Sequence, residues 1–177
     1  MKKIKLYIAA SIDGYIASLG GDMDWLLEFP ITSKENYGYD DFYETVDTVI
    51  MGGRTYREIS LMPVVWPYKG KTTYIVTRDT TAGNNQEYHY ITEDIVEAAN
   101  KLKEGTGKDI WLVGGGELTG MLMEDKLIDE MVITYIPVTL GSGVRLFQDC
   151  SKEIPWTLKE AKSYPNDVLQ VTYTIKR

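Results

Sequence analysis

The sequence predicts an α/β fold in which a mostly parallel central sheet is flanked by helices and ends in an antiparallel C-terminal hairpin. Two observations support this prediction. Apolar stretches that alternate every second residue are separated by stretches with helical periodicity, an order typical of parallel sheets. In 156–177, two strand-like stretches are separated only by Pro165-Asn166-Asp167, which favours a tight turn. Because no linker or repeat interrupts the 177 residues, we expect a single domain spanning 1–177.

The expected strands are short and apolar. In 3–11, Ile4, Leu6 and Ile8 alternate on one face, so this stretch is the first strand. A loop rich in glycine and aspartate follows at 13–24. The other strands that precede the hairpin are expected at 48–53, 72–78, 109–115 and 130–138.

Helices are expected at 39–46, at 54–60, in the stretch before Gly105, and from the glycines at 114–116 to residue 126. The helix before Gly105 has the clearest signals. Thr92 is its expected N-cap, and acidic residues in the first turn favour the helix dipole. An apolar stripe follows as far as Leu102, and Gly105 ends the helix.

The composition excludes several classes of function. A net charge of −7 argues against a nucleic-acid partner, for which a basic face is expected. One histidine and one cysteine leave no set of zinc ligands, and the single Cys150 fits a reducing cytoplasm. No apolar run approaches the roughly 20 residues that a membrane span needs. We therefore expect a cytoplasmic protein with no metal, no nucleic-acid partner and no membrane partner.

Two stretches share one design, in which a strand runs through glycines into a helix: "TVIMGGRTY" and "DIWLVGGGELTG". Backbone amides at a helix N-terminus, left uncovered by glycine, form a site suited to a pyrophosphate. In an open α/β sheet such turns lie at the carboxyl edge of the strands, where ligands bind. The alternative is that the glycines only permit close packing of helix on sheet. Neither turn is G-x-G-x-x-G, so a standard Rossmann domain is not indicated.

Arginines accompany these turns. The strand "YIVTRD" ends in Thr77 and Arg78, and Arg54 follows the first glycine pair. Guanidinium groups match phosphate geometry, and arginine commonly accommodates the 2′-phosphate of NADP. Asp79 would instead favour NAD, and the alternative for each arginine is an ordinary surface residue.

The segment "AASIDGYIA" interrupts a strand-like stretch with Asp13 and Gly14. One interpretation is a turn in which Asp13 caps its own backbone. The functional interpretation makes Asp13 a polar group at the mouth of a cleft, able to bind a substrate hydroxyl or relay a proton. Asp13 is thus the first candidate for substrate polarisation, and Asp41 is the second.

Taken in order, these stretches resemble the dihydrofolate reductase superfold, and within it the reductase domain of the bifunctional deaminase-reductases of riboflavin biosynthesis. The resemblance covers nearly the whole chain. It is carried by "AASIDGYIA", Met23-Asp24-Trp25, "VIMGGRTY", "YIVTR", "IWLVGGGEL" and "GSGVRLF".

The resemblance implies that NADPH is the cofactor and that the glycine turns and the Thr-Arg strand end hold it. It also implies that Ala10 and Ile16 flank the nicotinamide. The cofactor-binding residues it implies are Ala10, Ile16, Gly52, Gly53, Arg54, Thr55, Thr77, Arg78, Val113, Gly114, Gly115, Gly116 and Leu118.

The chain departs from the family pattern in three places. The turn "MGGRT" has glycine where dihydrofolate reductases have arginine, which shifts the guanidinium of Arg54 by one position. The deaminase half with its zinc ligands is absent, so no deamination is expected. The stretch "PITSKENYGYDDFYE" offers one lysine, Lys34, where riboflavin-pathway reductases usually present arginines toward a phosphorylated ribose.

The expected function is an NADPH-dependent reductase that transfers hydride to a small heterocycle or a ribosylamino-pyrimidine. Dihydrofolate reductase activity and a non-catalytic nucleotide-binding module remain the alternatives. We also expect a homodimer formed through the C-terminal strands or the stretch "VITYIPV".

Overall fold

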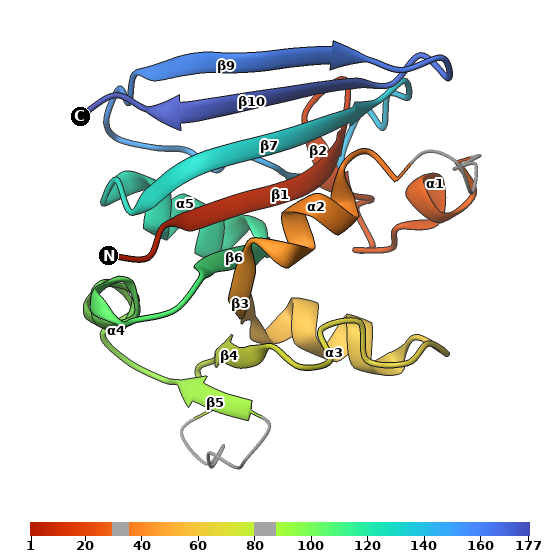
Figure 1. Ribbon diagram of the computed structural model, residues 1–177. Helices are drawn as coiled ribbons and strands as arrows, with labels where there is room; N and C mark the ends of the chain where they lie inside the picture. The colour runs from red at the N-terminus through yellow and green to blue at the C-terminus, as the bar shows by residue number, and fades with distance from the viewer. Residues whose placement is uncertain (30–35, 80–87) are drawn as a thin grey trace.

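The computed structural model describes residues 1–29, 36–79 and 88–177 (Figure 1). The strands are β1 (Ile4–Ser11), β2 (Tyr15–Ala17), β3 (Val46–Gly52), β4 (Thr72–Val76), β5 (Tyr88–Ile91), β6 (Asp109–Gly114), β7 (Ile128–Ile136), β8 (Val144–Arg145), β9 (Trp156–Ser163) and β10 (Leu169–Ile175). The helices are α1 (Asp24–Leu27), α2 (Tyr39–Glu44), α3 (Gly53–Leu61), α4 (Ile95–Glu104) and α5 (Gly116–Glu124). Lys34 lies outside the described residues.

The central sheet has the predicted direction of strands. Within the described residues it contains eight strands in the order β5-β4-β3-β6-β1-β7-β10-β9. The strands from β5 to β7 pair in parallel. β10 runs antiparallel to both β7 and β9, so the C-terminal hairpin is also confirmed. Figure 1 shows the hairpin at one end of the sheet and β5 at the other.

Four short elements were not predicted: α1, β2, β5 and β8. β2 and β8 pair with each other in a small separate sheet, and β5 extends the main sheet beside β4. Their two to four residues are too few to show a period. The expected N-cap of α4 was also wrong, because Asp94 rather than Thr92 precedes the helix, with φ 44° and no capping hydrogen bond from its side chain.

The stretch "VITYIPV" is not at an edge of the sheet. It belongs largely to β7, which lies between β1 and β10. The terminal strands of the sheet are β5 and β9. Pairing of two copies through β7 is therefore ruled out by the strand order, whereas β9 remains an edge strand.

Because successive side chains along the central strands point to opposite faces, apolar residues form a separate layer on each face of the sheet. On one face, Leu6 of β1 and Leu112 of β6 are fully buried in a cluster that also contains Leu122 of α5. On the other face, Trp111 of β6 packs in a second cluster with Phe42 of α2. Helices thus cover both faces, as predicted. No helix in the described ranges is both long enough and apolar enough to cross a membrane.

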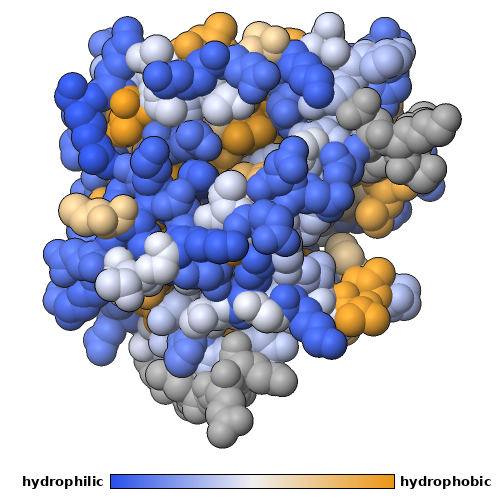
Figure 2. All heavy atoms as spheres, viewed as in Figure 1, coloured by the Kyte–Doolittle hydropathy of each residue, from blue (hydrophilic) through white to orange (hydrophobic). Residues whose placement is uncertain are grey.

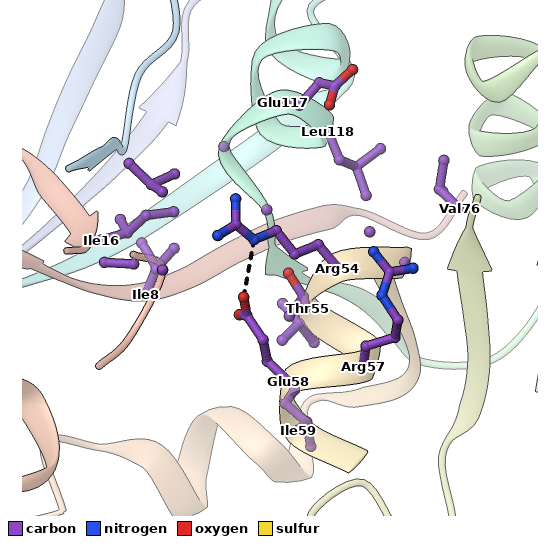
Figure 3. Close-up of a pocket in the computed structure, with 18 of the residues that line it drawn as sticks. Ile8, Ile16, Arg54, Thr55, Arg57, Glu58, Ile59, Val76, Glu117 and Leu118 are labelled. Atoms are coloured by element: carbon purple, nitrogen blue, oxygen red, sulfur yellow. Dashed lines mark hydrogen bonds and ion pairs between the residues drawn. The ribbon is translucent and has the colours of Figure 1, made fainter. Parts of the chain in front are cut away.

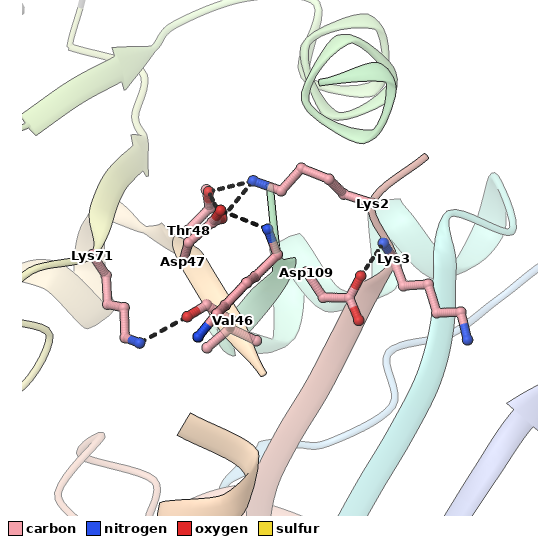
Figure 4. A network of polar contacts seen from close by, with 8 residues as sticks. Lys2, Lys3, Val46, Asp47, Thr48, Lys71 and Asp109 are labelled. Atoms are coloured by element: carbon pink, nitrogen blue, oxygen red, sulfur yellow. Dashed lines mark hydrogen bonds and ion pairs between the residues drawn. The ribbon is translucent and has the colours of Figure 1, made fainter. Parts of the chain in front are cut away.

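A polar network ties together the starts of three central strands (Figure 4). The Lys2 ammonium donates to Asp47 Oδ1 at 2.6 Å and to Thr48 Oγ1 at 2.7 Å. The Lys108 amide donates to Asp47 Oδ2 at 2.7 Å. Burial opposes ionisation of Asp47, but these hydrogen bonds outweigh it and hold the pKa of the carboxyl below its usual value. The network fixes the amino end of the parallel strands, opposite to the glycine turns.

Candidate active site

Three turns meet at the carboxyl ends of β4, β3 and β6, which are neighbours in the sheet. A Cβ atom added to Gly115 would lie 3.3 Å from Thr55 Oγ1 and 3.9 Å from the Gly52 backbone. A Cβ added to Gly53 would lie 3.4 Å from the Thr77 side chain. The two glycine turns and the Thr-Arg strand end are therefore in mutual contact, at the edge of the sheet where ligands bind in α/β folds.

Different physical causes explain why glycine occupies each position of these turns. Gly114 and Gly115 have φ values of +135° and +93°, which side chains other than glycine rarely adopt. A Cβ at Gly116 would come within 2.7 Å of the Arg145 carbonyl oxygen, so this glycine permits α5 to pack closely. Backbone conformation and packing thus account for the triple glycine without any ligand.

Gly52 is different. Its backbone is extended, with φ −71° and ψ 152°, a conformation that any residue adopts. The nearest atom to an added Cβ would be the Gly114 carbonyl oxygen at 4.0 Å, so a methyl group has room within the protein. Gly52 precedes the first residue of α3 and faces an open cavity. Unlike Gly114, Gly115 and Gly116, Gly52 is explained better by a bound anion than by the fold.

The cavity next to these turns has a volume of about 1080 Å³, enough for a dinucleotide and a second small molecule. The structure brings most of the residues implied by the family resemblance to its lining (Figure 3). Those that line it are Ile16, Gly52, Gly53, Arg54, Thr55, Thr77, Arg78, Val113, Gly115, Gly116 and Leu118.

Two residues of that set do not line the cavity. Ala10 is fully buried in the core together with Leu6, whereas its β1 neighbours Ile8 and Ala9 line the cavity. Gly114 is buried at the end of β6, where an added Cβ would contact Ile8 at 3.4 Å. The nicotinamide-flanking position expected for Ala10 is therefore not supported by the geometry.

Three arginines line the cavity, and they have different partners. Arg54 Nε donates to Glu58 at 3.0 Å, and its Nη2 donates to the Gly20 carbonyl at 3.3 Å. Arg78 forms an exposed ion pair with Glu117. Arg57 has no hydrogen bond or ion pair in the part of the chain that the structure describes. Figure 3 shows Arg54 extending toward Ile8 and Ile16, and Arg57 rising from α3 on the side of Val76.

Sequence reasoning did not select Arg57. A signal was present, because Arg57 follows Arg54 by three residues and lies on the same side of the helix. The missing information was the partner of each arginine, which depends on contacts outside the helix.

Neither candidate acid lines the large cavity. The Asp13 carboxylate accepts hydrogen bonds from Ser11 Oγ at 2.6 Å and from the amides of Leu140 and Gly141 at 3.1 and 2.7 Å. The Ser11 bond is the main cause that lowers the pKa of Asp13. Its observed role is to hold the turn after β1 against residues 140–141. Asp41 is exposed on α2.

Most of the remaining lining is aromatic or aliphatic, and most of these side chains were not predicted. Trp111 and Tyr7 come from β6 and β1, where strand alternation places them opposite to Leu112 and Leu6. The face of the sheet on which Trp111 and Tyr7 lie could have been inferred from the alternation of side chains along β6 and β1. Tyr68 lies in a stretch without periodicity, which gave no local signal.

The family model of the RibD C-terminal domain matches residues 2–170. The chain belongs to this family. YwjB of Bacillus subtilis (strain 168) is 41% identical over 163 residues, which make up 92% of each chain. A Shewanella sp. PV-4 protein named for riboflavin biosynthesis is 28% identical, with a TM-score of 0.88 over 99% of both chains. The RibD C-terminal domain of this chain is therefore reductase-like.

More distant structures share the fold. The Thermotoga maritima diaminohydroxyphosphoribosylaminopyrimidine deaminase/5-amino-6-(5-phosphoribosylamino)uracil reductase has a TM-score of 0.72 at 16% identity, and the match covers 99% of this chain but 57% of that one. Dihydrofolate reductase from Enterococcus faecalis, in complex with NADP(H), has a TM-score of 0.68 at 15% identity over 99% and 97% of the two chains. The RibD C-terminal domain thus has the dihydrofolate reductase-like fold that the sequence motifs predicted.

Proposed function

We propose that this protein is an NADPH-dependent reductase acting on a C=N bond of a small heterocycle or ribosylamino-pyrimidine. The observation that carries the proposal is the accessible Gly52 backbone at the start of α3, in contact with the second glycine turn and beside a cavity of about 1080 Å³. The structure of a fold relative, dihydrofolate reductase from Enterococcus faecalis, is a complex with NADP(H), which supports this choice of cofactor.

The residues present fit a dinucleotide. Amides at the N-termini of α3 and α5 suit the pyrophosphate, because a helix N-terminus carries partial positive charge and uncovered N–H groups. Arg57 and Arg78 are the candidates for the 2′-phosphate, and Arg57 is the better one because no carboxylate of the described chain pairs with it. Ile8 and Ile16 offer an apolar surface for the nicotinamide.

When bound, NADPH would supply the hydride that reduces the carbon of the C=N bond, and the proton for the nitrogen would come from solvent. The protein positions the two reactants in one cavity and surrounds the reacting atoms with apolar side chains. The lone Cys150 favours a cytoplasmic location as part of this proposal.

Equilibrium titrations test the cofactor. NADPH and NADH are titrated at one ionic strength, with tryptophan fluorescence as the signal, and NADPH is expected to bind at least about tenfold more tightly. Arg57→Gln should remove most of this preference, whereas Arg177→Gln, which changes an arginine outside the cavity, should retain it. Equal affinities of the parent protein for NADPH and NADH would refute the proposed 2′-phosphate contact.

Turnover is tested separately by NADPH oxidation against ribosylamino-pyrimidine, dihydrofolate and carbonyl acceptors. Oxidation that depends on an acceptor supports the reductase. Tight NADPH binding without oxidation for any acceptor would favour a non-catalytic nucleotide-binding module.

A further inference from the structure

The cavity has two chemically different ends. Its charged lining residues are those of the glycine turns and the residues next to them: Arg54, Arg57, Glu58, Arg78, Asp79 and Glu117. The other end is lined by carbon-rich side chains, among them Tyr7, Met23, Leu26, Ile59, Tyr68 and Trp111. Within the described chain, no lysine, arginine or carboxylate lines this second end. Arg54 and Glu58 pair with each other across consecutive turns of α3.

The aromatic wall of the second end is held in place by its own contacts. The rings of Tyr68 and Trp111 meet edge to face, with centroids 5.1 Å apart. Trp111 Nε1 donates to the Tyr7 carbonyl at 3.2 Å, and the Tyr7 hydroxyl donates to the Tyr37 carbonyl at 2.9 Å. The polar groups of Trp111 and Tyr7 are satisfied within the protein, so these two side chains present ring faces and edges to a ligand. Such a surface favours flat, uncharged rings.

Apolar side chains continue to the surface. Leu27 of α1 lines the cavity and is 65% exposed. Val64, which follows α3, also lines it and is 60% exposed. Figure 2 shows hydrophobic atoms on both sides of a notch at the right of the molecule, where α1 and the end of α3 lie in Figure 1. A ligand that enters here passes between carbon surfaces rather than charged ones.

We propose that the hydride acceptor is an uncharged, flat heterocycle and that a phosphorylated sugar derivative is disfavoured. This inference rests on the proposed function, because it places NADPH at the charged end. A phosphate group in the apolar end would lose its water and would meet no cation among the residues that the structure describes there. Arg54 already pairs with Glu58, and the cofactor phosphates would occupy Arg57 and Arg78. The protein would thus differ in substrate from the Thermotoga maritima enzyme, whose name specifies a phosphoribosylamino-uracil.

Calorimetric titration of the NADP⁺-saturated protein tests this inference. The ligands are 2-amino-4-hydroxypteridine, 5-amino-6-(5-phosphoribosylamino)uracil and the same uracil without its phosphate. The pteridine and the dephosphorylated uracil are each expected to bind at least about tenfold more tightly than the phosphorylated compound. Equal or tighter binding of the phosphorylated compound would overturn the inference.

A pair of exposed leucines provides a matched control. Leu27→Arg places a cation at the apolar end. It should weaken binding of the pteridine several-fold and strengthen binding of the phosphorylated uracil. Leu61→Arg changes a leucine that is 85% exposed and does not line the cavity, so both affinities should stay unchanged. If Leu27→Arg and Leu61→Arg change the two affinities equally, the substrate does not bind at the apolar end.

The readout separates this inference from the proposed function. Acceptor binding is measured without turnover, whereas the proposed function fails if NADPH does not bind or is not oxidised. If NADP⁺ does not bind, the same titrations on the cofactor-free protein still rank the three ligands.

Discussion

Replacement of Gly52 by alanine separates a cofactor contact from a folding requirement. The extended backbone at Gly52 accepts alanine, and an added Cβ has its nearest neighbour at 4.0 Å. Reduced entropy of the unfolded chain stabilises by about 0.4–1 kcal/mol. Loss of glycine at an N-cap costs a comparable amount, of order 0.5–1 kcal/mol. The two effects nearly cancel, so the melting temperature without ligand should change by less than about 2–3 °C.

The effect on cofactor affinity should be much larger. Gly52 lines the cavity directly before α3, so the new methyl group would stand where phosphate oxygens approach the amide hydrogens. Loss of one hydrogen bond to a charged group costs about 1.5–3 kcal/mol. This corresponds to a roughly ten- to hundredfold weaker NADPH affinity.

Calorimetry and a thermal melt on the same preparation provide the two measurements. Gly20→Ala is the matched control, because Gly20 does not line the cavity and an added Cβ there would meet its nearest atom at an ordinary 3.4 Å. Parental affinity for NADPH in a folded Gly52→Ala protein would refute a phosphate contact at this turn.

Three further predictions follow from the structure. Gly115→Ala should lower the melting temperature without ligand by roughly 2–10 °C, because φ is +93° and strain of this kind costs about 1–3 kcal/mol; an unchanged melt would contradict the turn geometry. Burial raises the pKa of Tyr7 to about 12 from 10.0, so the stability it contributes is present below pH 10 and is lost between pH 10 and 12. Chemical denaturation across that range should show a smaller decline for Tyr7→Phe than for the parent. We expect a homodimer that uses the edge strand β9, and light scattering that finds only a 20.1 kDa species would exclude it.

Local patterns in the sequence were sufficient to predict the main elements and the family. Alternation at Ile4, Leu6 and Ile8 marks a strand because burial on one face repeats every second residue, and the order of strands and helices favours parallel pairing. The glycine turns were also recognisable, since their residues are contiguous. The ordered motifs then identified the dihydrofolate reductase-like fold.

The roles of single polar residues depended on the tertiary structure. Asp13 and Arg54 looked available in the sequence, but Asp13 holds residues 140–141 and Arg54 pairs with Glu58 and reaches Gly20. The aromatic wall similarly joins Tyr7, Tyr68 and Trp111 from distant segments. A local period reports only whether a side chain is buried. Which groups it meets is decided by strand order and by loops that bring remote residues within hydrogen-bonding distance, and those contacts leave no periodic signal in the chain.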